Sequence, residues 1–204
     1  MSESPWRAGI TAEDYERHMA GTGQPRANAD LLAELFRERP PARGAAVLFA
    51  GAGTGQIFDD FPVEMLEPYR VTCTDINADF LRRLAARFPC ATAVDDIECP
   101  TLTGPFELAI VILVLEHVDW RRAVGGLCGI ARRVFVVIQR NPEGLVARTL
   151  RGTMSLVRGQ LLSADKLIAE FETRGLQLVR TSTRAVHDGK SMVAMEFVRA
   201  RDAG

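Results

Sequence analysis

Short apolar runs alternate with longer amphipathic segments along most of the chain, and this alternation restricts the possible folds more than any other feature. Such a pattern is typical of βα units around a mostly parallel sheet. The runs that we expect to form strands between residues 45 and 138 are Ala45–Ala50, Arg70–Thr74, Ala91–Val94, Leu108–Leu113 and Val134–Ile138. Between them we expect helices at Ala78–Phe88, capped by Asn77, and at Trp120–Ile130, capped by Asp119.

The two ends of the chain depart from this alternation. Before Pro40-Pro41, the segments Thr11–Ala20 and Asn28–Arg39 read as helices, with Asn28 or Asp30 available as the cap of the second. After a helix from Ser163 to Arg174, the strand-like runs 176–186 and 191–198 flank Asp188-Gly189, which is a strong hairpin-turn signal. We therefore predict an α/β fold with a helical preface, a doubly wound and mostly parallel sheet, and a C-terminal antiparallel hairpin.

The composition narrows the class of protein. With 204 residues, 47% of them apolar, the chain has the size of one domain with a substantial core. A formal charge of −1 gives no support for a nucleic-acid partner and favours small molecules. The longest apolar run, Leu108–Leu115, is too short to cross a bilayer, and the first residues lack the pattern of a secretory signal, so we expect a soluble cytoplasmic protein with no membrane partner.

The cysteines do not indicate a metal site. No CxxC pair and no histidine at metal-ligand spacing accompanies them, so the sequence predicts neither a zinc site nor a disulfide framework. The four are Cys73, Cys90, Cys99 and Cys128.

The sharpest local signal is VLFAGAGTGQ, residues 47–56, where a buried strand runs into a turn that contains Gly51, Gly53 and Gly55. Missing Cβ atoms let a backbone bend tightly and approach a ligand. The dinucleotide fingerprint places its third glycine three positions after the second, where this chain has Gln56, so the spacing disfavours NAD. A turn that serves packing alone is the alternative.

Acidic residues follow the next two expected strands. Asp75 stands 20 residues after Gly55, where a carboxylate can accept hydrogen bonds from both hydroxyls of a ribose. Asp96 follows the third run and can accept from an adenine amino group, although Asp95 competes for that role. A helix-start charge at Asp75 and solvated loop aspartates at the other two positions are the alternatives. All these positions lie at carboxyl ends of strands, where open α/β sheets bind ligands.

The segments VLFAGAGTG, CTDIN, AVDDI and FELAIVILVLEHV stand in the order and spacing of the class I, Rossmann-like methyltransferases that use S-adenosylmethionine (SAM). The last segment resembles the FDxVxxxxxLEH stretch of that family, and its LEHV is similar to that of small-molecule methyltransferases. The resemblance is close over roughly residues 45–140. It implies a seven-stranded sheet, SAM as the cofactor and methyl transfer to a small-molecule acceptor.

Position by position, the resemblance also implies roles for single residues. The turn of Gly51, Ala52, Gly53 and Gly55 would pass under the methionine part of the cofactor, and Asp75 would hold the ribose. Ile76 would pack on the adenine, Asp96 and the backbone of Ile97 would meet the adenine edge, Leu113 would lie near the sulfonium, and Tyr15 or His18 would close over the methionyl end. Two positions depart from the family pattern: Phe49 replaces a frequent acidic residue, and Glu107 replaces a common Asp.

Methyl transfer from a sulfonium mainly requires alignment of donor and acceptor, so a general base is needed only for some acceptors. His117, just after the fourth strand, is our candidate for that base, because a neutral imidazole is available near pH 7. The alternative is a structural histidine that bonds to the neighbouring helix start. His18 is a lesser candidate, and His187 at the hairpin turn is expected in solvent.

We divide the single domain 1–204 into a helical preface (1–43), a cofactor-binding core (44–139), a candidate substrate lid (140–162) and a terminal helix with hairpin (163–204). The lid segment contains Arg140, Arg148, Arg151 and Arg158, which would favour an anionic acceptor. An exposed arginine-rich helix is the alternative.

The leading hypothesis is thus SAM-dependent methylation of a small molecule. Phe49 and the lack of an evident base motivate a second hypothesis, a catalytically silent SAM-binding or interaction protein of methyltransferase descent. A nicotinamide-dependent oxidoreductase is a third, disfavoured by Gln56 and by the terminal hairpin. The acceptor, the methylated atom and the oligomeric state are not encoded in any motif that we find.

Overall fold

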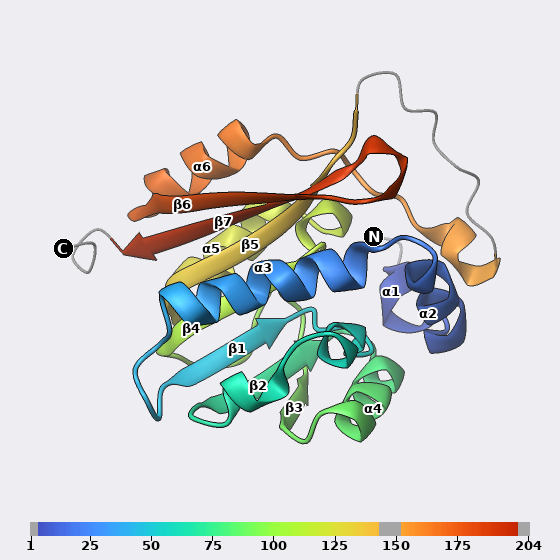
Figure 1. Cartoon of the computed structure of the whole chain (residues 1–204), viewed down its shortest axis with the longest axis horizontal. Helices are drawn as coiled ribbons and strands as arrows, with labels where there is room; N and C mark the ends of the chain where they lie inside the picture. Colours follow the sequence, from blue (N-terminus) through green and yellow to red (C-terminus); the bar gives the residue numbers. More distant parts are fainter. Residues whose placement is uncertain (1–3, 143–151, 200–204) are drawn as a thin grey trace.

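The computed structural model describes residues 4–142 and 152–199, and its centre is one seven-stranded sheet in the order β3-β2-β1-β4-β5-β7-β6 (Figure 1). Strands β1 to β5 pair in parallel, whereas β7 is antiparallel to both of its neighbours. The predicted seven-stranded, mostly parallel sheet with a terminal hairpin is confirmed. The strands are β1 (Ala46–Ala50), β2 (Arg70–Asp75), β3 (Ala91–Val94), β4 (Phe106–Ile112), β5 (Ala131–Arg140), β6 (Leu176–Ala185) and β7 (Ser191–Arg199).

The terminal hairpin turns where the sequence indicates. Asp188 and Gly189 both take left-handed backbone angles, with φ of 62° and 70°. Asp and Gly tolerate this conformation better than other residues, which is why the pair favours tight hairpin turns. Because β7 returns between β5 and β6, it completes the sheet.

Helices cover both faces of the sheet, as the alternation of side chains along the strands requires. Leu48 and Ala50 of β1 belong to the apolar cluster that includes α5 (Trp120–Ile130) and α6 (Ala164–Thr173). Val47 and Phe49 point the opposite way, into the cluster built with α3 (Gln24–Glu38). The residues just after β1 therefore lie between these two layers.

Two helices begin at the caps that the sequence predicts. The Asn77 side chain accepts from the N–H groups of Asp79 and Phe80 at the start of α4 (Ala78–Arg87), and the Asp119 side chain caps α5 in the same way, so both predicted caps are confirmed.

The predicted start of α3 is wrong. The helix begins at Gln24, and Asn28 lies inside it, buried. Gly23, with a left-handed φ of 71°, lets the chain turn into the helix, and Pro25 sits in the first turn, where its missing N–H leaves no bond unmade.

Short helices gather at the carboxyl ends of the central strands (Figure 1). They are α1 (Pro5–Ala8), α2 (Ala12–Ala20) and the 3₁₀ helix η4 (Gly152–Leu156), and Ile10, Ala12, Met154 and Val157 form a small apolar cluster with Phe80 of α4. The turn after β1 leads into 3₁₀ helices η1 (Gln56–Asp59) and η2 (Val63–Leu66) rather than into an α-helix; the remaining 3₁₀ helices are η3 (Leu115–His117) and η5 (His187–Gly189). Within the described residues, no helix is long and apolar enough to span a membrane.

Candidate functional site at the carboxyl edge of the sheet

The glycine turn bends sharply after β1. Gly51 and Gly53 take φ of 68° and 59°. A Cβ at Gly51 would lie 2.5 Å from Cγ2 of Val114, so this position must be glycine for the turn to pass so close to the segment after β4. The Ala52 N–H donates to the Thr74 carbonyl at 2.8 Å, which ties the turn to the end of β2.

Asp75, the last residue of β2, lies directly against this turn. Its Oδ2 accepts from the Gly53 N–H at 2.9 Å and its Oδ1 accepts from the Asn77 N–H at 2.9 Å, with only 8% of the residue exposed. Burial raises the pKa of the Asp75 carboxyl to about 6, although backbone N–H groups of Asn77, Gly53 and Ile76 favour the ionised form. The structure thus brings together the glycine turn and Asp75, the two strongest features of the sequence.

The aspartates after β3 have different partners. Asp95 accepts from both the N–H and the hydroxyl of Thr101 at 2.8 Å, so its carboxylate closes the loop that it begins. Asp96 accepts from the Glu98 N–H at 3.0 Å, and its other oxygen lies 3.7 Å from Nη2 of Arg7 in α1. Asp96 faces the helical preface, and Ile97 packs against the α5 side of the sheet.

One aromatic side chain of the preface, Tyr15, lies over the glycine turn, and a second, Trp6, lies against His117. The Tyr15 hydroxyl would be 3.2 Å from a Cβ built on Gly53, and its ring stacks on Phe80 with centroids 5.1 Å apart. Trp6 lies 5.0 Å from the His117 ring, centroid to centroid, and its carbonyl accepts from Nδ2 of Asn77 at 3.0 Å. Burial, with the nearby Asp75 carboxylate, raises the pKa of Tyr15 above its usual range. The resemblance implies a place for Tyr15 near this turn, whereas no feature of the sequence points to Trp6.

His117 lies in η3, after β4. Its Nδ1 is enclosed and has no hydrogen-bond partner in residues 4–142 and 152–199. Burial lowers the pKa of His117 to about 4, so the imidazole is neutral at physiological pH. Burial also lowers the pKa of His18 in α2, with help from Lys190, and His187 is exposed. The alternative that His117 caps the next helix does not hold, because Asp119 does so.

Glu116, the neighbour of His117, is the second buried carboxyl group at this edge. Its Oε1 accepts from the Gln139 N–H at 2.8 Å. Burial raises the pKa of Glu116 to about 7, against the effect of that bond. Glu116 was not among the predicted site residues, since a Glu in LEHV gives no sign that it will be buried.

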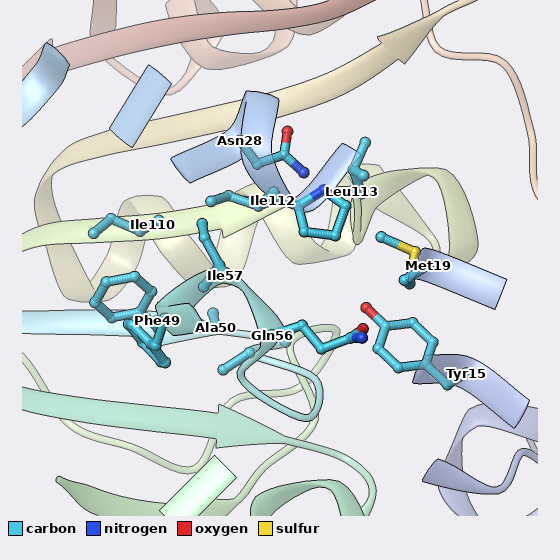
Figure 2. A pocket seen from close by; sticks show the side chains of 14 residues that line it. Tyr15, Met19, Asn28, Phe49, Ala50, Gln56, Ile57, Ile110, Ile112 and Leu113 are labelled. Atoms are coloured by element: carbon cyan, nitrogen blue, oxygen red, sulfur yellow. The ribbon is translucent and has the colours of Figure 1, made fainter. Parts of the chain in front are cut away.

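A cavity of about 60 Å³ adjoins the glycine turn on the side of α3 (Figure 2). Leu113, which takes a left-handed φ of 57°, lines it together with Gly51 and Ala52. A non-glycine residue in this conformation is strained, and such residues often occur at ligand sites. The other lining residues are Tyr15, Met19, Pro25, Asn28, Phe49, Ala50, Gln56, Ile57, Phe58, Ile110 and Ile112.

The two arginines of the candidate lid that the structure describes, Arg140 and Arg158, have partners away from the cavity. Arg148 and Arg151 lie outside the described residues. Nε of Arg140 donates to the Ser191 hydroxyl at 3.3 Å, and Arg158 donates to the carbonyls of Ser155 and Val157. Neither lines the cavity.

Neither a metal cluster nor a related sequence identifies the site. In the described ranges, no group of three or more His, Cys, Asp or Glu side chains is arranged to hold a metal ion. No family model matches the chain, and no curated protein matches it.

Solved structures match over most of the chain. Magnesium protoporphyrin IX methyltransferase from Synechocystis PCC 6803 with bound SAM has a TM-score of 0.72 at 17% identity, covering 94% of this chain and 93% of that one. An S-adenosylmethionine-dependent methyltransferase from Clostridium acetobutylicum gives 0.65 at 10% identity, with 93% and 99% covered. Geranyl diphosphate C-methyltransferase from Streptomyces coelicolor, in complex with Mg²⁺, geranyl diphosphate and S-adenosylhomocysteine (SAH), gives 0.63 at 11%, with 84% and 80% covered. The chain has the fold of a Rossmann-like methyltransferase. At these identities the likeness concerns the methyltransferase fold, and the chemistry has to be argued from the site.

Proposed function

We propose that the chain binds SAM at the carboxyl edge of the sheet and transfers its methyl group to a small-molecule acceptor. The observation that carries this proposal is the bond from the Gly53 N–H to Asp75, which holds a tight backbone bend against a buried carboxylate at the ends of neighbouring strands. Such a carboxylate can accept from ribose hydroxyls. Structures of the same fold that contain SAM or SAH support the choice of cofactor.

The donor set fits an adenosine, but the preface lies over it. Asp75 uses two of about four lone-pair positions for Gly53 and Asn77, and a third backbone N–H, of Ile76, also favours its ionised form. Tyr15 lies over Gly53, and Trp6 lies against Tyr15 and His117, with its carbonyl bonded to Asn77. Binding of an adenosine therefore requires α1 and α2 to move away from the strand ends.

With the preface displaced, each residue would have a separate task. Asp75 would hold the ribose, Ile76 would cover the adenine, and Asp96 with the backbone of Ile97 would meet its edge. The bend at Gly51–Gly53, with Leu113, would enclose the methionyl end, whereas Tyr15 belongs to α2 and would move away with it. SAM supplies an already activated methyl group, so the protein's main contribution is the alignment of the acceptor and the exclusion of water.

His117 would serve as the base for an acceptor that must lose a proton. Its neutral imidazole can take a proton at the enclosed, unpartnered Nδ1. While the preface is closed, burial holds the pKa of His117 near 4; displacement of Trp6 from its ring would raise that pKa and make the imidazole a stronger base.

A catalytically silent SAM-binding protein is the second candidate. Phe49 favours it, because its ring packs against Phe58 with centroids 5.3 Å apart and leaves an apolar wall at a position where the family often has an acidic group. Calorimetric binding of SAH without methyl transfer to any member of a broad acceptor collection would support this candidate over the enzyme.

Calorimetry with SAH and with NAD tests the proposal. We expect SAH to bind and NAD not to bind. Asp75→Ala should weaken SAH binding by at least about tenfold, since it removes a buried acceptor of two hydrogen bonds. Asp79→Ala is the matched control, because this carboxylate is exposed and paired with Arg82 on α4. Equal SAH affinity of the two variants, or binding of NAD alone, would reject the proposal.

A further inference from the structure

The cavity beside the glycine turn has an apolar inner wall. Figure 2 shows Phe49 and Ile110 at one end of this cavity and Tyr15 and Met19 at the other. Phe49 is 3% exposed, and its ring packs against that of Phe58, which holds it in the wall. No Asp, Glu, Lys, Arg or His belongs to the lining that the structure describes. A charged group bound here would lose its hydration without gaining a counter-charge.

The neutral polar side chains of the lining do not replace that counter-charge. Oδ1 of Asn28 and Oε1 of Gln56 are enclosed, so neither amide oxygen is available to accept from an ammonium group of a ligand. The Tyr15 hydroxyl belongs to α2, which a bound adenosine displaces. Backbone carbonyls of the turn can still accept from an ammonium group, but a neutral acceptor does little more than replace water.

The acidic side chains of the adjoining elements have other partners. Asp75 accepts from backbone N–H groups on the other side of the turn. Glu16 of α2 pairs with Arg83 at 3.1 Å and with Arg87 at 2.8 Å. Glu116 accepts from a backbone N–H of β5, and none of the three carboxylates lines the cavity. Among the described residues, an ammonium group in this cavity has no carboxylate with which to pair.

We propose that the site recognises the adenosine part of its ligand and gains little from the amino-acid part, so that an uncharged 5′-thioether of adenosine binds about as well as SAH. This inference rests on the proposed function, because Gly51, Ala52 and Leu113 line the cavity and would enclose the methionyl end. At about 60 Å³ the cavity holds a few non-hydrogen atoms, such as the sulfur and carbon of a methylthio group. Phe49 is then the residue that determines this specificity, since it forms the part of the wall where a carboxylate would supply the missing counter-charge.

Calorimetry with SAH and with 5′-methylthioadenosine, in which a methyl group replaces the whole amino-acid end, tests the proposal on the full chain. We expect SAH to bind no more than about fivefold more tightly than 5′-methylthioadenosine. A site that pairs the charges of the amino acid should favour SAH by roughly ten- to hundredfold, because a hydrogen bond to a charged group contributes that much. A preference for SAH greater than fivefold would overturn the proposal.

Two substitutions of Phe49 test its part in this specificity. Phe49→Asp places a carboxylate in the inner wall and should raise the ratio of SAH affinity to 5′-methylthioadenosine affinity by about fivefold or more. Phe49→Leu removes the same ring without adding a charge and should keep the wild-type ratio. If circular dichroism shows that Phe49→Asp does not fold, the wild-type ratio decides. A folded Phe49→Asp with an unchanged ratio would place the amino-acid end outside this cavity and overturn the proposal.

Asp75→Ala establishes whether both ligands use one site. Because the ribose is common to the two molecules, this substitution should weaken SAH and 5′-methylthioadenosine by the same factor, at least about tenfold. Binding of 5′-methylthioadenosine that does not change in Asp75→Ala would put this ligand elsewhere on the molecule and contradict the proposal.

The two ligands also separate this inference from the proposed function. A chain that binds 5′-methylthioadenosine but no SAH would refute the use of SAM for methyl transfer while retaining a site for uncharged adenosine thioethers. A chain that binds SAH with a preference greater than fivefold would do the reverse. Absence of binding for both ligands would reject both proposals.

Discussion

Glu116 is a carboxyl group whose ionisation opposes folding. Burial raises its pKa from 4.5 to about 7, so its favourable contribution to stability is complete below pH 4.5 and is lost as the pH rises through 7. Glu116→Gln keeps the acceptor for the Gln139 N–H and removes the titration. Relative to the wild type, the variant should gain roughly 1–3 kcal/mol of unfolding free energy between pH 5 and pH 8.5, measured by urea denaturation.

The test is how much the difference in unfolding free energy between variant and wild type changes from pH 5 to pH 8.5. A glutamine amide also alters stability by itself, but by the same amount at both pH values. Glu67→Gln serves as the control, because Glu67 is exposed at the end of η2. A stability difference that is the same at pH 5 and pH 8.5 would show that Glu116 titrates in its usual range.

The contact of Trp6 with His117 allows the closure of the preface to be measured through the pKa of His117. Because burial lowers the pKa of His117 to about 4, and Trp6 covers its ring at 5.0 Å, Trp6→Ala should raise this pKa towards 6.5. The measurement is an NMR titration of the imidazole Cε1–H signal, with exposed His187 as the reference in the same spectrum. An unchanged His117 curve would mean that residues other than Trp6 bury the ring.

Single residues differ in how far the sequence reveals them. Asp75 beside Gly53 follows from spacing, because the carboxyl ends of neighbouring parallel strands must meet at one edge. Asn28 looked like a helix cap, since Asn favours that position, and only the fold shows it as a buried amide in a cavity wall. Trp6 gave no signal, because a lone aromatic near the N-terminus has no periodic partner.

At the scale of elements, the carboxylate of Asp14 joins α2 to η4 by hydrogen bonds. Asp14 Oδ2 accepts from the N–H of Thr153 at 2.8 Å and from its hydroxyl at 2.9 Å. If the closed preface excludes SAM, the fraction of molecules in the closed arrangement lowers the apparent affinity for SAM. Asp14→Ala should therefore tighten SAH binding about two- to fivefold in calorimetry, as the population of open chain increases.

Glu13→Ala is the control for Asp14→Ala. Glu13 is exposed on the same helix, and among the ion pairs of the described residues it takes part in one only, with Arg17. Weaker binding by Asp14→Ala would contradict this view of the preface and indicate that α2 holds a bound cofactor in place.

Elements with explicit end signals were predictable, and those that depend on tertiary contacts were not. The caps of α4 and α5 follow from Asn77 and Asp119, whose side chains bond to the first N–H groups. The 3₁₀ helices after the glycine turn could not be predicted, because Phe58, Phe61 and Leu66 adopt their positions by packing on the α3 face of the sheet. The preface was predicted as helical, but its position near Asp75 depends on tertiary contacts that no local pattern encodes.

For the whole molecule, the seven-stranded sheet could be predicted because local patterns and topology rules agree. Parallel βα units and an Asp-Gly hairpin leave few arrangements of the strands. Which cavity stays open is a different matter, since it depends on how side chains from α2, α3, β1 and β4 meet. The fold and the turn could therefore be predicted, whereas the acceptor could not: the sequence left an anionic acceptor and an exposed arginine-rich helix as alternatives, and no charged side chain lines the described wall of the cavity.

A buried ion pair connects the two halves of the molecule at the edge opposite the site. Nη2 of Arg133 in β5 donates to Glu196 Oε1 in β7 at 2.8 Å and to the Arg39 carbonyl, at the end of α3, at 2.7 Å. The Glu196 side chain is 0% exposed and that of Arg133 is 11% exposed. Removing Glu196 leaves the guanidinium of Arg133 enclosed without its counter-charge.

Glu196→Ala should therefore lower the unfolding free energy by about 3–5 kcal/mol, which corresponds to a fall in Tm of roughly 10 °C for a chain of this size, measured by calorimetry. The double variant Arg133→Met with Glu196→Leu should recover most of the loss, because well-packed apolar residues can replace a buried pair at little cost. If the double variant is as unstable as the single one, the geometry of β5, β7 and α3 depends on these hydrogen bonds themselves, and the charge of Arg133 is not the cause. SAH affinity should be equal in all three proteins, since this cluster and the carboxyl ends of the strands lie at opposite edges of the sheet.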